Sequence, residues 1–109
     1  MVLPRVAKIA VEQTAFHFDK LYDYTVPDRL GDVPCGSRVL VPFGGGNRRR
    51  QGILMAYDEA AEVEKLKPVA AVLDAQPLLG PEMLDLVVWL RERTFCTYFD
   101  AVRAMLPTG

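Results

Sequence analysis

The stretch RVLVPFGGGNRRRQGILMAY, residues 38–57, decides the fold of this chain. It contains two runs rich in apolar residues, 38–43 and 51–57, each of strand length. Between the runs lie three glycines, one asparagine and three arginines. Glycine-containing connections of this kind join neighbouring antiparallel strands. The stretch therefore predicts a β-hairpin with a long, basic tip.

Three more strands are expected around this hairpin, over residues 5–11, 21–26 and 69–73. The first alternates basic and apolar residues, and the second is rich in aromatic and β-branched residues before Pro27 ends it. No long helical pattern separates the five strands. Short strands in such a series favour a compact antiparallel sheet that curls into a small β-barrel, here over residues 1–75.

The hydrophobic period changes beyond residue 76, where helices are expected. Gly80-Pro81-Glu82 is typical of a helix start, because proline is tolerated in the first turn and an acid there faces the helix dipole. The spacing i, i+3, i+4, i+7 then predicts an apolar stripe. Its members are Met83, Leu86, Val87 and Leu90, with Trp89 widening the face.

A second helix is expected between Thr97, which can cap it together with Asp100, and Pro107, which ends it. Its apolar stripe is formed by Tyr98, Ala101, Val102 and Met105. Residues 76–109 are therefore predicted to form a helical hairpin that packs on the barrel. The fold class is α+β, and barrel and hairpin together make one domain.

Composition excludes several classes of protein. The 109 residues fit one domain, and 13 Lys plus Arg against 14 Asp plus Glu give a net charge of −1, so no global attraction to nucleic acid is expected. The apolar run over residues 84–90 is interrupted by Asp85 and bounded by Arg91, too short to span a bilayer. The N-terminus lacks a secretory signal. We expect a cytoplasmic protein, away from membranes, that binds its ligand locally.

Residues that enzymes and metal sites use are sparse in this chain. His17 is the single histidine and the only base of that type for Ser37 or Cys35. Neither Cys35 nor Cys96 has a second Cys or His at ligand spacing, and the Gly-rich residues 44–46 lack the Lys-Ser/Thr ending of a phosphate-binding loop. We predict no catalytic residue, no metal site and no cofactor in this chain, and two separate thiols.

The stretch Leu21-Tyr22-Asp23-Tyr24 is the most informative for function. On a strand, Tyr22 and Tyr24 share one face and Asp23 points to the other. The structural interpretation is two tyrosines in the barrel wall beside an exposed acid. The functional one is a carboxylate that accepts hydrogen bonds from a sugar hydroxyl or an exocyclic amine. Lys67, held before Pro68, is either a surface lysine or part of a pocket lining.

Several motifs, in order along nearly the whole chain, together resemble a known family. They are Tyr22-Asp23-Tyr24, Arg38-Val39-Leu40-Val41-Pro42-Phe43-Gly44, Gly52-Ile53-Leu54, Lys65-Leu66-Lys67-Pro68-Val69, Val72-Leu73-Asp74, Tyr98-Phe99-Asp100 and Met105-Leu106-Pro107. The series resembles the N-terminal 3′-end DNA-binding domain of the PriA family (primosomal protein N′), bacterial replication-restart DNA helicases.

The resemblance implies a domain that binds the 3′-hydroxyl end of a nascent strand at a stalled replication fork without base selectivity. It places Tyr22, Asp23, Gly44 and Lys67 around the terminal nucleotide, although phenylalanine is common at the position of Tyr22. It assigns no role to Arg48, Arg49 and Arg50, which stay candidate phosphate contacts by composition, or a solvated basic cluster. The alternative function is a protein-interaction module that docks on helicase or primosome components.

The resemblance also implies that the chain is a fragment of a longer protein. That protein would be an ATP-dependent 3′-to-5′ DNA helicase that hydrolyses ATP, holds zinc and assembles the primosome. Its partners would be single-stranded DNA 3′ ends, branched fork DNA, other primosome proteins and the single-stranded-DNA-binding protein. The fragment alone is expected not to be an enzyme.

Overall fold

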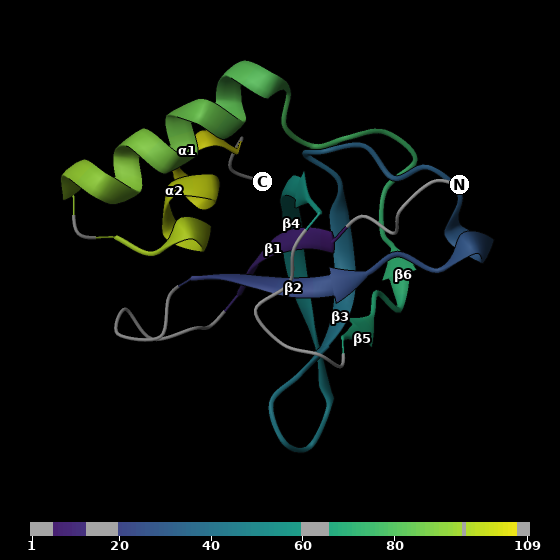
Figure 1. The fold of residues 1–109 in the computed structure, drawn as a ribbon. Helices are drawn as coiled ribbons and strands as arrows, with labels where there is room; N and C mark the ends of the chain where they lie inside the picture. The colour runs from purple at the N-terminus through teal and green to yellow at the C-terminus, as the bar shows by residue number, and fades with distance from the viewer. Residues whose placement is uncertain (1–5, 13–19, 60–65, 95, 107–109) are drawn as a thin grey trace.

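A computed structural model describes residues 6–12, 20–59, 66–94 and 96–106 of the chain. These residues form a curled six-stranded sheet followed by two helices, which confirms the α+β class (Figure 1). The strands are β1 (Val6–Val11), β2 (Leu21–Thr25), β3 (Arg38–Phe43), β4 (Arg48–Asp58), β5 (Lys67–Pro68) and β6 (Ala71–Val72). A 3-10 turn, η2 (Asp28–Leu30), follows β2, and the helices are α1 (Pro81–Thr94) and α2 (Tyr98–Met105).

The predicted hairpin is present, with a shorter tip than the sequence suggested. Strand β3 has the predicted bounds, but β4 begins at Arg48, so the three arginines belong to the strand. The turn closes between Gly44 and Asn47, both at positive φ, and the Asn47 N–H donates to the Gly44 carbonyl oxygen at 3.1 Å. Because this turn is tight, the ladder continues up to Phe43 opposite Arg48.

Strand β4 holds the sheet together, in the order β5-β2-β1-β4-β3-β6. Its first half pairs with β3 and its second half with β1, and Gly52 and Ile53 pair with both neighbours. A Cβ atom at Gly52 would lie 2.6 Å from Cγ2 of Ile9, so no side chain fits there without a shift. Strands β1 and β4 therefore approach each other closely at this glycine.

The two edges of the sheet meet at residues 67–72, because β5 and β6 are separated only by Val69 and Ala70. The Val69 N–H donates to Thr25 of β2, and the Ala70 N–H donates to Leu40 of β3. Since β5 runs parallel to β2, the sheet is mixed and not antiparallel throughout. The single strand expected over 69–73 is two short strands, because the chain changes its pairing partner between them.

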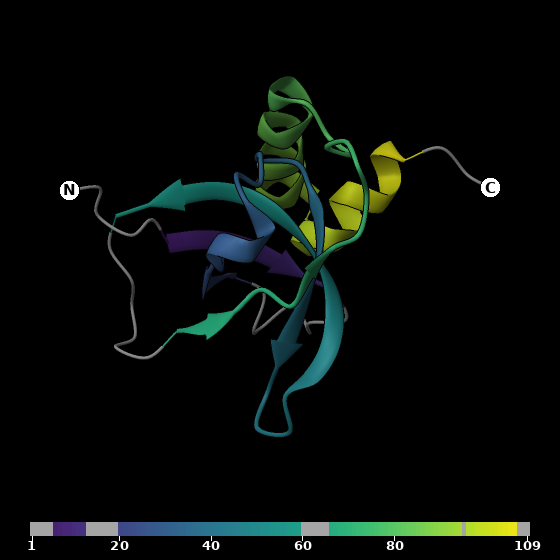
Figure 2. The same cartoon turned by 90° about the vertical axis from the view of Figure 1, so that its right-hand side faces the viewer.

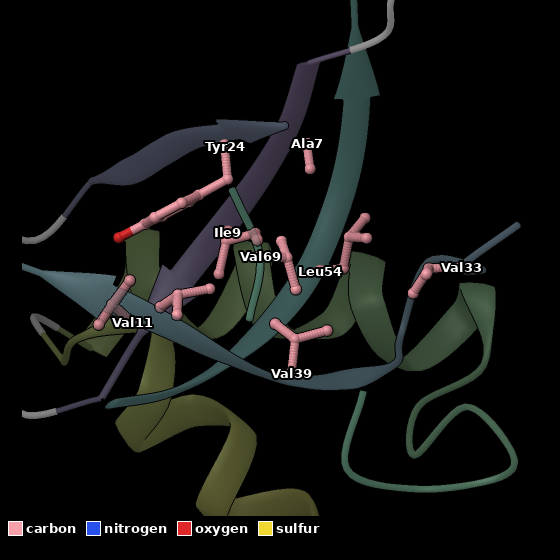
Figure 3. Packing of buried hydrophobic residues seen from close by; sticks show 9 residues of the cluster. Ala7, Ile9, Val11, Tyr24, Val33, Val39, Leu54 and Val69 are labelled. Carbon is pink, nitrogen blue, oxygen red and sulfur yellow. The ribbon is translucent and has the colours of Figure 1, made fainter. Parts of the chain in front are cut away.

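Two hydrophobic clusters stabilise the fold. The first fills the inside of the curled sheet (Figure 3) and consists of Ala7, Ile9, Val11, Tyr24, Val33, Val39, Val41, Leu54 and Val69. The second joins the sheet to the helices and consists of Ala10, Ile53, Met55, Leu79, Leu84, Val87, Phe99, Ala101 and Val102. Strand β1 contributes to both clusters and is therefore buried on both faces, which explains its imperfect alternation.

The helices lie at one end of the molecule and the β3–β4 hairpin at the other (Figure 2). The Thr97 cap is confirmed, since Thr97 and Asp100 form a capping box at the start of α2. The stripe predicted for α1 is wrong in part, because Leu86 is 45% exposed and Leu84 is buried instead. Helix α1 packs through the buried Leu84 and Val87 together with Met83 and Leu90, which are half-buried against the same cluster, and Trp89 lies on the surface.

Some residues named in the sequence predictions are not described by the structure, and the predictions for the two cysteines can be compared with it. Arg5, His17 and Pro107 lie outside the described residues. Cys35 and Cys96 are both half-buried and are not joined by a disulfide, as expected. No helix in the described part of the chain is long and apolar enough to cross a membrane.

Candidate functional site

The base of the β3–β4 hairpin gathers aromatic and basic side chains from four strands. The rings of Tyr22 and Phe43 meet edge to face, with centroids 4.9 Å apart. The Arg50 guanidinium lies 4.7 Å from the centroid of the Phe43 ring, and Lys20 Nζ lies 5.2 Å from that of Tyr22. Together with Gly44 and Lys67 we call Tyr22, Phe43 and Arg50 the hairpin-base cluster. Such arrangements of aromatic and cationic groups suit stacking of planar ligands.

Lys67, which lies 23 positions after Gly44 in the sequence, joins this cluster through a hydrogen bond. Its Nζ donates to the Gly44 carbonyl oxygen at 2.9 Å, and its backbone is set by pairing with Tyr24 at the start of β5. Figure 1 shows β5 close to the base of the hairpin. Gly44 adopts a φ of +75°, a conformation that side chains other than glycine rarely adopt. Three of the four residues predicted to surround a ligand, Tyr22, Gly44 and Lys67, therefore lie together.

Tyr24 supports this cluster from inside the sheet. Its hydroxyl donates to the Pro42 carbonyl oxygen at 2.7 Å, and the residue is 3% exposed. Burial, and secondarily Tyr22, raises the pKa of the Tyr24 phenol to about 12, although Arg50 acts in the opposite direction. Tyr24 is therefore a protonated donor that ties β2 to β3 at neutral pH.

Asp23, the fourth predicted residue, lies apart from the cluster. It pairs across strands with Lys8 of β1, whose Nζ donates to Asp23 Oδ1 at 2.6 Å. The side chains of Lys8 and Asp23 are 18% and 5% exposed. The pleat of β2 points the Asp23 side chain to the face opposite Tyr22, as the sequence predicted. Lys8 was missed as its partner, because no local pattern gives the register between β1 and β2.

The three arginines of β4 do not form a single patch. Arg48 and Arg49 are exposed and Arg50 is half-buried. Since neighbouring side chains on a strand point to opposite faces, Arg49 lies on the other face from Arg48 and Arg50. A ligand on one face of β4 therefore contacts either Arg49 or the pair Arg48 and Arg50, but not all three. Phe43 was also missed as a site residue, although it lies directly before Gly44 in the Val-Pro-Phe-Gly motif.

In the described part of the chain, no group of three or more His, Cys, Asp or Glu residues is arranged to hold a metal ion. Ser37, one of the nucleophiles considered from the sequence, is 2% exposed and lies in the fold's interior. The hairpin-base cluster offers a ligand stacking, hydrogen bonding and charge.

Comparison with known proteins gives matches over nearly the whole chain. The family model of the PriA 3′DNA-binding domain (3′BD) matches residues 8–107. The replication restart protein PriA of Bacillus subtilis is 36% identical over 106 residues, which cover 94% of this chain and 13% of that protein. PriA of Haemophilus influenzae is 36% identical over 84 residues, 75% of this chain and 11% of that protein. PriA of Chlamydia pneumoniae is 24% identical over 91 residues, 84% of this chain and 12% of that protein.

Proposed function

The chain belongs to the PriA 3′DNA-binding domain family, and from this premise we propose that it binds the 3′-hydroxyl end of a nascent DNA strand without selecting its base. The observation that carries the proposal is the contact between Lys67 and Gly44 beside the ring pair of Tyr22 and Phe43. These groups come from separate parts of the chain and face one small area. Stacking surfaces and backbone groups interact with features that all nucleotides share.

Asp23 supplies the specificity for the hydroxyl in this proposal, through the 5% of its side chain that stays exposed beside Lys8. A carboxylate has about four acceptor sites, so it can accept from a ligand hydroxyl while keeping its hydrogen bond to Lys8. Strand β2 pairs with β5 only at Tyr24 and Thr25. Tyr22 and Asp23 precede these residues, so β5 does not pair with β2 at their positions. Because Tyr22 and Asp23 point to opposite faces of β2, a nucleotide that contacts both the ring of Tyr22 and the carboxylate of Asp23 must pass around this edge of the strand. A 3′-phosphate there would meet a like charge and be disfavoured.

The test compares two ends of the same strand. A 5′-labelled oligothymidylate is titrated with this chain by fluorescence anisotropy, once with a 3′-hydroxyl and once with a 3′-phosphate. We expect the hydroxyl end to bind at least about tenfold more tightly, a difference of about 1.4 kcal/mol, since a phosphate meets the Asp23 carboxylate as a like charge. Equal affinities would remove the end-recognition proposal. Oligonucleotides that differ only in the last base should bind alike, which tests the lack of base selectivity.

A pair of variants shows whether Asp23 is responsible. Asp23→Asn should weaken binding of the hydroxyl end and narrow the difference between the two ends, because it removes the charge that rejects phosphate. Asp85→Asn makes the same change on the exposed surface of α1 and should change neither affinity. A preference that persists in Asp23→Asn would assign end recognition to other residues.

A second candidate function is docking on other proteins. Three large apolar side chains of α1, Leu86, Val88 and Trp89, are 45%, 37% and 49% exposed. If α1 forms an interface with helicase or primosome components, Trp89→Ser should abolish that association and leave DNA binding intact. Association measured by ultracentrifugation with and without DNA separates the two functions.

The chain spans about an eighth of the length of the curated relatives it matches. For the whole protein we propose replication restart in the cytoplasm. Its activity would be that of an ATP-driven 3′-to-5′ helicase with bound zinc, acting on fork DNA. Other primosome proteins and single-stranded-DNA-binding protein would be its partners. ATP hydrolysis by the full-length protein on a forked substrate tests this assignment.

A further inference from the structure

A pocket of about 380 Å³ lies next to the hairpin-base cluster, on the segment where the sheet's two edges meet. Its described lining consists of Arg29, Pro42, Asn47, Arg49, Lys67, Pro68, Val69 and Ala70. The turn η2 contributes Arg29, the hairpin contributes Pro42, Asn47 and Arg49, and residues 67–70 form the remainder. Apart from Lys67, the pocket uses none of the residues of the hairpin-base cluster.

The pocket is a local concentration of positive charge in a chain whose net charge is −1. Arg29, Arg49 and Lys67 line it, and none of its described lining residues is Asp or Glu. Such a site attracts an anion although the whole molecule does not. The Asn47 amide adds a neutral donor.

Two of the three cations are held in place by backbone carbonyl groups. Arg29 Nη2 donates to the Ala70 carbonyl oxygen at 2.8 Å, and Lys67 Nζ donates to that of Gly44 at 2.9 Å. A guanidinium has five N–H donors and an ammonium has three, so each of these side chains retains donors for a ligand. Because the carbonyl groups restrict both side chains, less side-chain entropy is lost when an anion binds.

We propose that this pocket holds an internucleotide phosphate of the strand whose 3′-terminal nucleotide occupies the hairpin-base cluster, a refinement that rests on the function proposed above. Lys67 belongs to both places, so a strand that ends at the cluster continues past the pocket. Arginine pairs with phosphate through charge-assisted hydrogen bonds, and a volume of about 380 Å³ accommodates a phosphate with part of its sugar. Arg49 contacts the phosphate, whereas Arg48 and Arg50, on the other face of β4, do not.

The experiment combines an arginine variant with a neutral linkage in the DNA. Wild type and Arg49→Ala are titrated with a 3′-hydroxyl oligothymidylate and with the same strands carrying one methylphosphonate at successive linkages from the 3′ end. Arg49→Ala should weaken binding to the charged strand about five- to tenfold. It should also reduce the slope of log K against log salt by about 0.7, the loss of one phosphate contact. One methylphosphonate position should weaken wild type by a similar factor and leave Arg49→Ala unchanged.

Arg48→Ala is the matched comparison, because it removes the same charge from the same strand but from its other face. It should weaken binding by no more than about twofold. Equal losses of affinity in Arg48→Ala and Arg49→Ala would overturn the assigned contact. It would also be overturned if, at every linkage tested, the methylphosphonate weakened binding of Arg49→Ala as much as binding of wild type. A hexa-aspartate peptide that binds as tightly as the oligonucleotide, with the same dependence on Arg49, would overturn it in favour of an acidic peptide.

Failure of this inference is distinguishable from failure of the proposed function. If Arg49→Ala binds like wild type and still prefers a 3′-hydroxyl to a 3′-phosphate, the phosphate contact is refuted and end recognition stands. If wild type does not distinguish the two ends but loses affinity in Arg49→Ala at one linkage, the pocket binds phosphate and end recognition is refuted.

Discussion

The ion pair between Lys8 and Asp23 should stabilise the fold as a coupled unit. We consider the single variants Lys8→Met and Asp23→Leu and the double variant that carries both. The two side chains lie directly opposite each other on β1 and β2, and their Nζ and Oδ1 atoms are 2.6 Å apart. Removing either partner alone leaves the charge of the other largely buried and without its ion-pair partner.

The exposed fractions of the side chains set the expected magnitudes. The Asp23 side chain is 5% exposed, so Lys8→Met should cost about 3 kcal/mol of unfolding free energy, as when one partner of a buried pair is removed. The Lys8 side chain is 18% exposed and can extend toward water, so Asp23→Leu should cost less, about 1.5 kcal/mol. In the double variant no charge remains without its partner, and about 2 kcal/mol of the summed cost should be recovered.

Urea unfolding followed by far-ultraviolet circular dichroism measures all four free energies. The more exposed pair of Arg38 and Asp74, at 36% and 29% exposure, is the control, and its coupling should not exceed about 1 kcal/mol. Additive costs at Lys8 and Asp23, or a Lys8→Met variant as stable as wild type, would refute the reasoning from burial.

Three further predictions concern stability. Because the raised pKa of Tyr24, about 12, exceeds its ordinary value of 10.0, the unfolded chain loses this proton first, and unfolding free energy should fall as pH rises from about 10 to 12. Tyr24→Phe, compared by urea unfolding across this range, should remove that part of the decline. Gly36→Ala should cost about 3 kcal/mol or more in urea, because its Cβ would lie 1.8 Å from the Leu79 carbonyl oxygen. Gly31→Ala, with nothing within 4 Å, should cost less, about 2 kcal/mol, from its backbone conformation alone. Thr97→Ala should cost about 1 kcal/mol in thermal unfolding, whereas Thr97→Ser should restore the cap; equal stability of the two would argue against it.

Elements whose signals lie within a few residues were predictable from the sequence. The bounds of β3 follow from one apolar run that ends in a glycine turn, and the start of α2 follows from Thr97 and Asp100 three positions apart. The class of fold follows as well, because the hydrophobic period changes only once, near residue 76. The predicted start of β4 was wrong, since three consecutive arginines after a glycine run indicate a loop unless their pairing with β3 is known.

The candidate site was predictable only through the family resemblance. Nothing in the spacing of Tyr22, Gly44 and Lys67 indicates that they lie together, and the contact between Lys67 and Gly44 depends on how the sheet curls. The α1 face was predicted only in part, because Met83, Leu84, Leu86 and Leu90 allow several apolar stripes and Leu84 was left out of the predicted one. Packing against the sheet selects one of these and leaves Trp89 exposed.

The sequence by itself determined which residues share a face of a strand, as with Asp23 pointing away from its two neighbouring tyrosines. Only the tertiary structure decided which residues face each other: Lys8 with Asp23, and Arg29 with Ala70, 41 positions away. The physical reason is that alternation along a strand repeats every two residues and carries no information on the neighbouring strand. Partner and register depend on packing of the whole chain, here where residues 67–72 bring the two edges of the sheet together.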